Sequence, residues 1–221
     1  RVNKIIKLSK KYNKIKPSIM DVGPGYGTFC NLANKSKFFS SVVAVEPSPS
    51  GAKNCKKKNI KVYEQTIEEL KTKEKFDIIV NFEVIEHLFS PKKFILSMRK
   101  FLNKKGFIIL TCPNGMGFDI QILKEKSDSI DHEHINYFNP HSIKKLFENC
   151  NFKILEIFTP GQLDVDLVRN KILDKKFNLN SNFFLNDIII DNYDSKGNEF
   201  QKYLINNKLS SNMWVVAQLK N

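Results

Sequence analysis

Residues 18–29 read Ser-Ile-Met-Asp-Val-Gly-Pro-Gly-Tyr-Gly-Thr-Phe, and this stretch decides the fold. Its short apolar run, with the acid Asp21 near its end, predicts a buried strand, and the three glycines that follow predict a tight turn. The residues from Thr28 onward have helical spacing. A strand, a glycine turn and a helix open a doubly wound sheet, in which ligands bind beyond the carboxyl ends of the strands. The stretch therefore predicts an α/β fold with a ligand site at the turn.

The spacing of the glycines narrows the class of ligand. Dinucleotide-binding folds use G-x-G-x-x-G, and phosphate-binding loops end in Gly-Lys-Ser/Thr. Here the glycines lie at 23, 25 and 27, and no lysine follows them. The carboxylate of Asp21 would repel a phosphate but suits an ammonium group. We therefore expect a ligand with an amino acid end and a nucleoside end.

This D-V-G-P-G-Y-G run resembles the first motif of class I S-adenosylmethionine (SAM) methyltransferases. The resemblance implies that SAM is the cofactor. Glu46, which ends a predicted strand about 20 residues beyond Gly25, stands where this fold has the carboxylate that accepts the ribose hydroxyls. In related methyltransferases the positions of Thr66 and Ile67 line the adenine, and Asn81 lies near the sulfonium. The implied SAM-binding residues are Asp21, Gly23, Gly25, Tyr26, Gly27, Glu46, Thr66, Ile67 and Asn81.

The rest of the chain fits a doubly wound, mostly parallel, seven-stranded Rossmann-like sheet. The predicted strands after the first lie at 41–46, 60–64, 76–81, 107–112, 152–158 and 213–219, and the last is expected to be antiparallel. Roughly fifty residues separate the sixth strand from the seventh, too many for a hairpin loop. We expect a basic helix at 1–16, a SAM-binding core at 17–158, an inserted lid or dimerisation element at 159–211, and the final strand of the core at 212–221.

The composition of the chain indicates where the protein is located and what it can bind. The 221 residues are 41% hydrophobic and contain no run of eighteen apolar residues, so we expect no membrane span. The four cysteines are scattered singly, which favours reduced thiols and a cytoplasmic location. The net charge is +13, and residues 1–16 contain seven basic residues and no acid. This segment is interpreted as a helix packed on the sheet with a solvated basic face, in preference to an arm that binds nucleic acid.

Two further segments contain groups that can carry out chemistry. Glu83-Val84-Ile85-Glu86-His87 follows the fourth predicted strand, and if it starts a helix, positions 83, 86 and 87 share one face. Asp131-His132-Glu133-His134 follows the fifth strand, whose carboxyl end faces the same edge of the sheet. Carboxylate and imidazole groups together form a mixed oxygen and nitrogen set that suits Mg²⁺ or Mn²⁺.

These two segments resemble a narrower group within the methyltransferases. E-x-x-E-H, a C-P-N run at 112–114 and D-H-E-H-x-x-x-F are similar to motifs of metal-dependent O-methyltransferases, which include ubiquinone-pathway enzymes and small-RNA 2′-O-methyltransferases. The resemblance implies that Glu83, Glu86, His87 and His134 hold the metal and that His132 is a base or supports the ligands. Metal-free catalysis with His134 or His87 as general base stays open. The H-E-H-x-x-Y-F run also resembles deoxysugar C-methyltransferases, in which its second histidine would be a base.

The sequence thus predicts a SAM-dependent methyltransferase that O-methylates a small hydroxylated metabolite. A sugar or glycan precursor is the favoured acceptor. The alternatives are an RNA ribose 2′-O-methyltransferase and a deoxysugar C-methyltransferase. A nucleic-acid acceptor is less favoured, because no RNA-binding module or interleaved aromatic patch is visible. A homodimer is left open by the inserted element.

Overall fold

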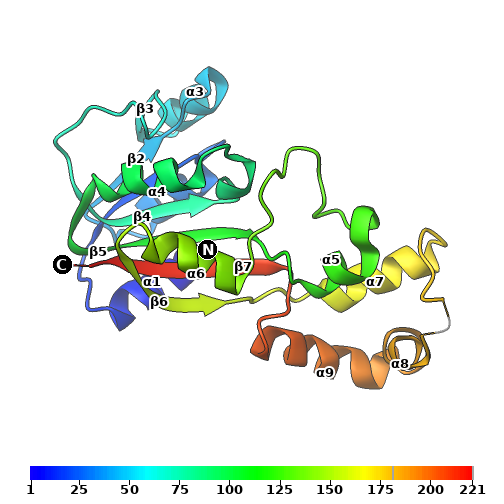
Figure 1. Ribbon diagram of the computed structural model, residues 1–221. Helices are drawn as coiled ribbons and strands as arrows, with labels where there is room; N and C mark the ends of the chain where they lie inside the picture. The colour runs from blue at the N-terminus through cyan, green and yellow to red at the C-terminus, as the bar shows by residue number, and fades with distance from the viewer. Residues whose placement is uncertain (181, 221) are drawn as a thin grey trace.

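The computed structural model describes residues 1–180 and 182–220, which form one sheet with helices on both faces and a helical unit at one end (Figure 1). The sheet order is β3-β2-β1-β4-β5-β7-β6. The seven predicted strands are confirmed. Their bounds are β1 Ser18–Val22, β2 Ser41–Val45, β3 Lys61–Tyr63, β4 Phe76–Phe82, β5 Leu102–Pro113, β6 Phe152–Phe158 and β7 Asn212–Leu219.

The direction of the strands fixes where a ligand can bind. β1 pairs in parallel with β2 and β4, and β4 pairs in parallel with β5, whereas β7 is antiparallel to both β5 and β6. The chain order along the sheet reverses between β1 and β4, so that their carboxyl ends flank the switch point of the fold. Ligands of doubly wound sheets bind in the crevice outside such a point. The glycine turn after β1 lies there.

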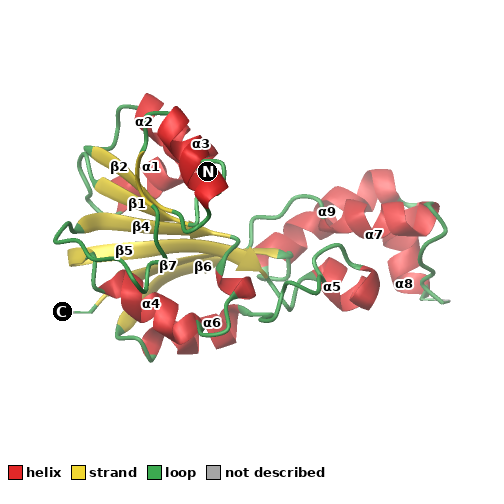
Figure 2. Ribbon diagram, turned by 90° about the horizontal axis from the view of Figure 1, so that it is seen from above, coloured by secondary structure: helices red, strands yellow, loops and turns green. Residues whose placement is uncertain are grey.

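Two hydrophobic cores lie on opposite faces of the sheet, because successive side chains of a strand point to opposite sides. Ile19 belongs to the core beneath α1, α2 and α3, whereas Met20 belongs to the core beneath α4 and α6 (Figure 2). These helices are α1 Val2–Lys11, α2 Thr28–Lys35, α3 Pro49–Lys57, α4 Pro91–Arg99 and α6 Pro140–Glu148.

The helical unit at the end of the sheet has a hydrophobic core of its own. It contains α7 (Asp164–Leu173), α8 (Phe183–Asn186), a π-helical turn at Asp187–Asp191 and α9 (Tyr193–Asn206). It also includes α5 (Phe118–Leu123), followed by the short helix η2 (Lys124–Lys126), which comes from the segment after β5. Phe118 of α5 packs with Val168 of α7 and Leu204 of α9. The unit is therefore built from two separate stretches of chain, and the sequence analysis had located only the second.

The basic segment at the N-terminus packs on the sheet. Ile5 and Leu8 of α1 are buried in the core beneath α2, and Tyr12 packs against Phe107 of β5. The helix ends at Lys11, short of the expected residue 16, and Ile15 beyond it is 91% exposed. In the described part of the chain, no helix combines the length and the apolar character that crossing a membrane requires.

Gly27 gives a direct test of the turn. Its φ is +69°, and a Cβ placed there would lie 2.8 Å from the Cys55 sulfur and 3.1 Å from Ile60 Cδ1. Gly27→Ala should therefore lower the free energy of unfolding by about 2 kcal/mol or more, through a left-handed backbone and a clash together. Gly25→Ala is the control, because φ is +53° but nothing lies within 4 Å of the new Cβ. Urea denaturation that gave equal losses at the two positions would contradict this account of the packing.

Candidate active site

The loop between β1 and α2 leaves open space above Gly25. The backbone N–H of Gly23 donates to the carbonyl of Val45 at 2.9 Å, which joins the start of the loop to the end of β2. A Cβ on Gly25 would meet nothing within 4 Å, while one on Gly23 would meet Val84 at 2.7 Å. A ligand can therefore approach the main chain closely at Gly25, whereas Gly23 is packed against the segment after β4.

Glu46 lies at the end of β2 with its carboxylate turned toward the glycine loop. One carboxylate oxygen accepts the Gly25 N–H at 3.0 Å and the other accepts the Ser48 N–H at 2.9 Å. The residue is also buried, with 6% of its surface exposed, so the side chain is held in a single orientation. Because an ionised carboxylate has about four acceptor sites, Glu46 can still accept hydrogen bonds from the hydroxyls of a ligand.

Asp21 is an almost completely buried acid near the end of β1. One of its oxygens accepts the Cys30 thiol at 3.3 Å, and the other has no hydrogen-bond partner. The pKa of Asp21 is raised to about 7, chiefly by burial and also by the nearby Glu46 carboxylate, while the Cys30 hydrogen bond and the charge of Arg1 act in the opposite direction. An unpaired buried carboxyl group is costly, and a cation that reached it would relieve that cost.

The other predicted SAM-binding residues occupy different environments. Asn81 is fully buried and donates from its amide to the Val22 carbonyl at 2.9 Å, joining β4 to β1. Tyr26 is 75% exposed at the rim of the glycine loop. Thr66 is half-buried and donates to Glu69 at 3.0 Å. Ile67 is part of the core beneath α4, so its side chain packs inside the domain.

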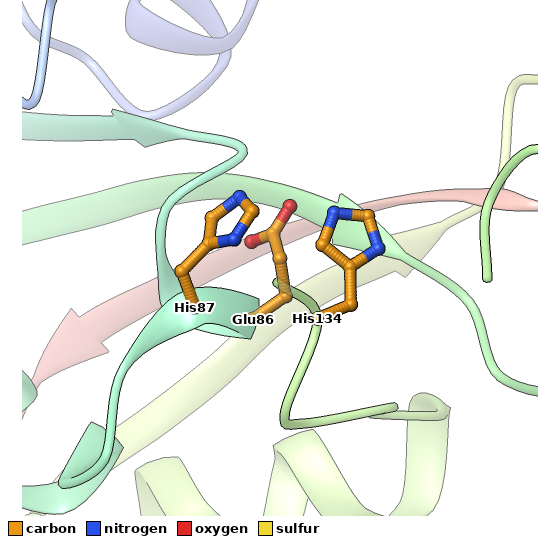
Figure 3. A group of neighbouring side chains, drawn as sticks. All are labelled: Glu86, His87 and His134. Carbon is orange, nitrogen blue, oxygen red and sulfur yellow. The ribbon is translucent and has the colours of Figure 1, made fainter. Parts of the chain in front are cut away.

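Glu86, His87 and His134 come together at the carboxyl ends of β4 and β5 (Figure 3). One ligand atom from each lies within 4.8 Å of the others, and the two imidazole rings are 4.7 Å apart between centroids. In Figure 3 the Glu86 carboxylate lies between the rings. The first two residues lie on the short 3-10 helix η1 (Ile85–His87), and His134 lies on the loop before α6.

Both histidines make the same kind of contact through Nδ1. His87 Nδ1 lies 3.0 Å from the carbonyl of Glu133, and His134 Nδ1 lies 2.9 Å from the carbonyl of Ser129. Because a carbonyl oxygen only accepts hydrogen bonds, Nδ1 must carry the proton in each ring. The lone pair of each neutral ring is therefore on Nε2. This arrangement is typical of histidines that bind a metal or accept a proton.

Glu86 is the acidic member of this group. It is 1% exposed, and neither of its carboxylate oxygens has a hydrogen-bond partner. Burial raises the pKa of Glu86 to about 8, and the charge of nearby Glu83 adds to the shift. An orphaned carboxyl group next to two imidazole rings fits a divalent cation by both charge and ligand type.

Glu83 and His132 lie outside this three-residue group. Glu83 has a left-handed backbone with φ of +55°, so the segment turns before η1 and does not form the expected helical face. Its carboxylate accepts the Thr111 hydroxyl and, at 3.2 Å, the Asn212 amide. The His132 side chain is 89% exposed and its Nδ1 lies 2.8 Å from Asp131.

A cavity of about 280 Å³ lies between the end of the sheet and the helical unit, lined by Glu83 but by none of the three grouped residues. Pro113 of β5 and Asn212 of β7 line it from the sheet, and Leu167 lines it from α7. Ser129, whose carbonyl holds His134, also lines it. The sequence analysis did not predict that Ser129 and α7 line this cavity. Every residue has a backbone carbonyl, and the position of the helical unit has no signature in the residue pattern.

The raised pKa of Asp21 predicts a pH-dependent stability. Between about pH 4 and pH 7 this group is ionised in the unfolded chain and protonated in the folded one, so the free energy of unfolding should fall as the pH rises, by about 1.4 kcal/mol per unit. Asp21→Asn should remove this part of the slope in urea denaturation between pH 4 and 7. Asp77→Asn is the control: hydrogen bonds from Ser18 and Asn103 contribute to a lowered pKa of Asp77, so its substitution should leave the slope unchanged. Parallel curves for native protein and Asp21→Asn would contradict the assignment.

Comparison with known proteins identifies the family. The family profile described as "Methyltransferase domain" matches residues 2–157. A ubiquinone biosynthesis O-methyltransferase of Rickettsia bellii is 28% identical over 172 residues, which are 71% of each chain. The plantazolicin methyltransferase BpumL in complex with SAH has the same fold, with a TM-score of 0.65 and 14% identity over 100% of this chain and 82% of that one. The methyltransferase domain of a bacterial protein named CtHen1 gives a TM-score of 0.63 with 16% identity, over 99% and 97% of the chains. The chain belongs to the methyltransferase domain family and is an enzyme of the SAM-dependent methyltransferase class.

Proposed function

We propose that the enzyme transfers the methyl group of SAM to a hydroxyl oxygen of a small acceptor. The observation that carries this proposal is the arrangement at one edge of the sheet. The glycine loop with Asp21 and Glu46 adjoins the group formed by Glu86, His87 and His134, and Gly23 packs directly against Val84 between them. A methyl donor bound at the loop would thus lie beside groups that can activate a hydroxyl.

In this proposal each end of SAM has a partner of fitting chemistry. The unpaired carboxyl group of Asp21 would ionise against the ammonium of the donor, and Glu46 would accept its ribose hydroxyls. Gly25 lets the main chain approach the ligand. Tyr26 and Gly27 would complete the loop, and Asn81 would support the strand end beneath the sulfonium. Thr66 would border the adenine together with the main chain of Ile67, whose side chain is in the core.

The ribose assignment predicts the effect of removing Glu46. Glu46→Ala should weaken SAM binding by about 1–3 kcal/mol, because charge-assisted hydrogen bonds to the ribose are lost. Titration calorimetry with SAM measures the change. Glu64→Ala is a matched control, since Glu64 follows β3 and forms an exposed ion pair with Lys56 at 2.7 Å. An affinity that stayed native in Glu46→Ala would assign the ribose to other residues.

Glu86, His87 and His134 would hold a Mg²⁺ or Mn²⁺ ion, with Glu83 next to them. Such an ion, when bound, lowers the pKa of an acceptor hydroxyl, so that its oxygen can attack near neutral pH. The chain contributes the positions of the ligands: carbonyl contacts at Nδ1 leave both Nε2 atoms available, and the buried carboxylate has no competing partner. The same free Nε2 atoms also suit a metal-free reaction, in which His134 or His87 takes the hydroxyl proton directly.

The acceptor would enter the cavity between the sheet and α7, with the 159–211 segment as its lid. The cavity volume of about 280 Å³ suits one small ring, and its lining includes Glu83 and Asp164. Acidic lining disfavours an anionic acceptor, which supports a neutral hydroxylated metabolite such as a sugar, a glycan precursor or a catechol. The net charge of +13 favours the second candidate, an RNA ribose 2′-O-methyltransferase.

Replacement of His134 tests the activity of the site. His134→Ala should abolish methyl transfer while SAM still binds, because the ring contacts the reacting hydroxyl directly or through the ion and not the donor. Transfer is followed with methyl-labelled SAM against small metabolites of a cell extract and, separately, against RNA. His141→Ala is the control, because His141 lies in the first turn of α6 and outside the three-residue group.

The two mechanisms differ in one further readout of the same experiment. If the ion is used, His134→Ala should weaken Mn²⁺ binding at least 10-fold, and a chelator should abolish native activity. If the ring is a general base, the chelator should have no effect. Full activity of His134→Ala would remove this residue from the reaction, and labelled RNA without labelled metabolites would establish the second candidate.

A further inference from the structure

Asn136 joins the two segments that carry the clustered side chains. Its backbone N–H donates to the carbonyl of Glu86 at 3.0 Å. Its side-chain amide donates to the carbonyl of Leu88 at 2.7 Å and to that of Glu86 at 3.3 Å. One residue therefore contacts the main chain on both sides of His87, from a loop position two residues after His134.

Few other polar contacts join these segments. Within the described residues, the further hydrogen bond between 83–90 and 127–138 is that of His87 Nδ1 with the Glu133 carbonyl, at 3.0 Å. This bond sets the tautomer of His87. Because the bond joins the two segments, it forms only in the register that Asn136 fixes between them. The register also sets the 4.7 Å separation of the two imidazole rings.

The short helix η1 has little rigidity of its own. It is a single 3-10 turn of three residues whose N-terminal cap, Val84, makes no side-chain hydrogen bond. Glu83 before it adopts a left-handed backbone. Isolated 3-10 turns have poor hydrogen-bond geometry. The orientation of Glu86 and His87 must therefore be supported from outside the turn, and the Asn136 amide supplies that support.

We propose that Asn136 is a positioning residue, which clamps η1 to the loop of His134 and thereby keeps Glu86 and His87 next to His134, with Nε2 of both imidazoles free. The inference concerns the geometry of the site and rests on the proposed function only for its consequence in catalysis. Loss of the side-chain amide removes the bond to the Leu88 carbonyl and one of the two bonds to the Glu86 carbonyl. The backbone N–H bond to Glu86 remains, but alone it no longer fixes the segment on both sides of His87.

The experiment compares native protein with Asn136→Asp and Asn136→Ala. The aspartate keeps the shape of the side chain and the backbone bond to Glu86 but offers no side-chain donor to the two carbonyls, so it separates side-chain hydrogen bonding from packing. Nitrogen NMR of the imidazole rings in metal-free protein should give the Nδ1–H tautomer for His87 and His134 in the native chain and a mixture at His87 in both variants. Mn²⁺ affinity, measured by calorimetry, should fall 10–100-fold in both.

Asn139→Ala provides the matched control for folding. Asn139 caps α6 through bonds from the His141 and Ser142 N–H groups at 3.0 and 2.9 Å, three residues beyond Asn136. Its loss should lower the melting temperature while tautomers and Mn²⁺ affinity stay native. Native tautomers or native Mn²⁺ affinity in Asn136→Asp would overturn the proposal. If the native chain binds no Mn²⁺, the metal part of the proposed function fails, and the tautomer comparison alone decides the role of Asn136.

Discussion

The contact between Gly23 and Val84 is the constraint on which the rest of the site depends. β1 and β4 pair in parallel with Asp21 opposite Val80, so the glycine loop and the segment after β4 leave the sheet side by side. A Cβ on Gly23 would lie 2.7 Å from a methyl group of Val84, which shows how closely the two segments are packed. The turn that suits a methyl donor and the turn that carries Glu86 and His87 are therefore held together by the backbone.

The sequence was informative wherever local pattern and chain topology agree. Apolar runs bounded by turn residues located all seven strands, and the predicted strand at 152–158 has the observed bounds of β6. The glycine loop and Glu46 were found because the spacing between them is a property of the doubly wound fold itself.

Other features depend on contacts that leave no mark in the sequence. A glutamate seldom adopts a positive φ, so the turn at Glu83 was not expected, and a helical face was expected in its place. The membership of α5 in the helical unit comes from the packing of Phe118 against residues far along the chain. The clamp by Asn136 uses backbone carbonyls, which every residue has, so no residue pattern indicates it.

The charges of the site oppose the charge of the whole molecule. The chain carries a net +13, yet Asp21, Glu46, Glu83 and Glu86 gather at one edge of the sheet. Burial raises the pKa values of Asp21 and Glu86, so both are held partly protonated at a cost in folding energy. A cation would relieve each cost, and in the proposed function these cations are the ammonium of the donor at Asp21 and a divalent ion at Glu86. A phosphate group would meet the opposite conditions at these two carboxyl groups. The energetics of these two carboxyl groups therefore support the proposal of cationic ligands next to a neutral acceptor.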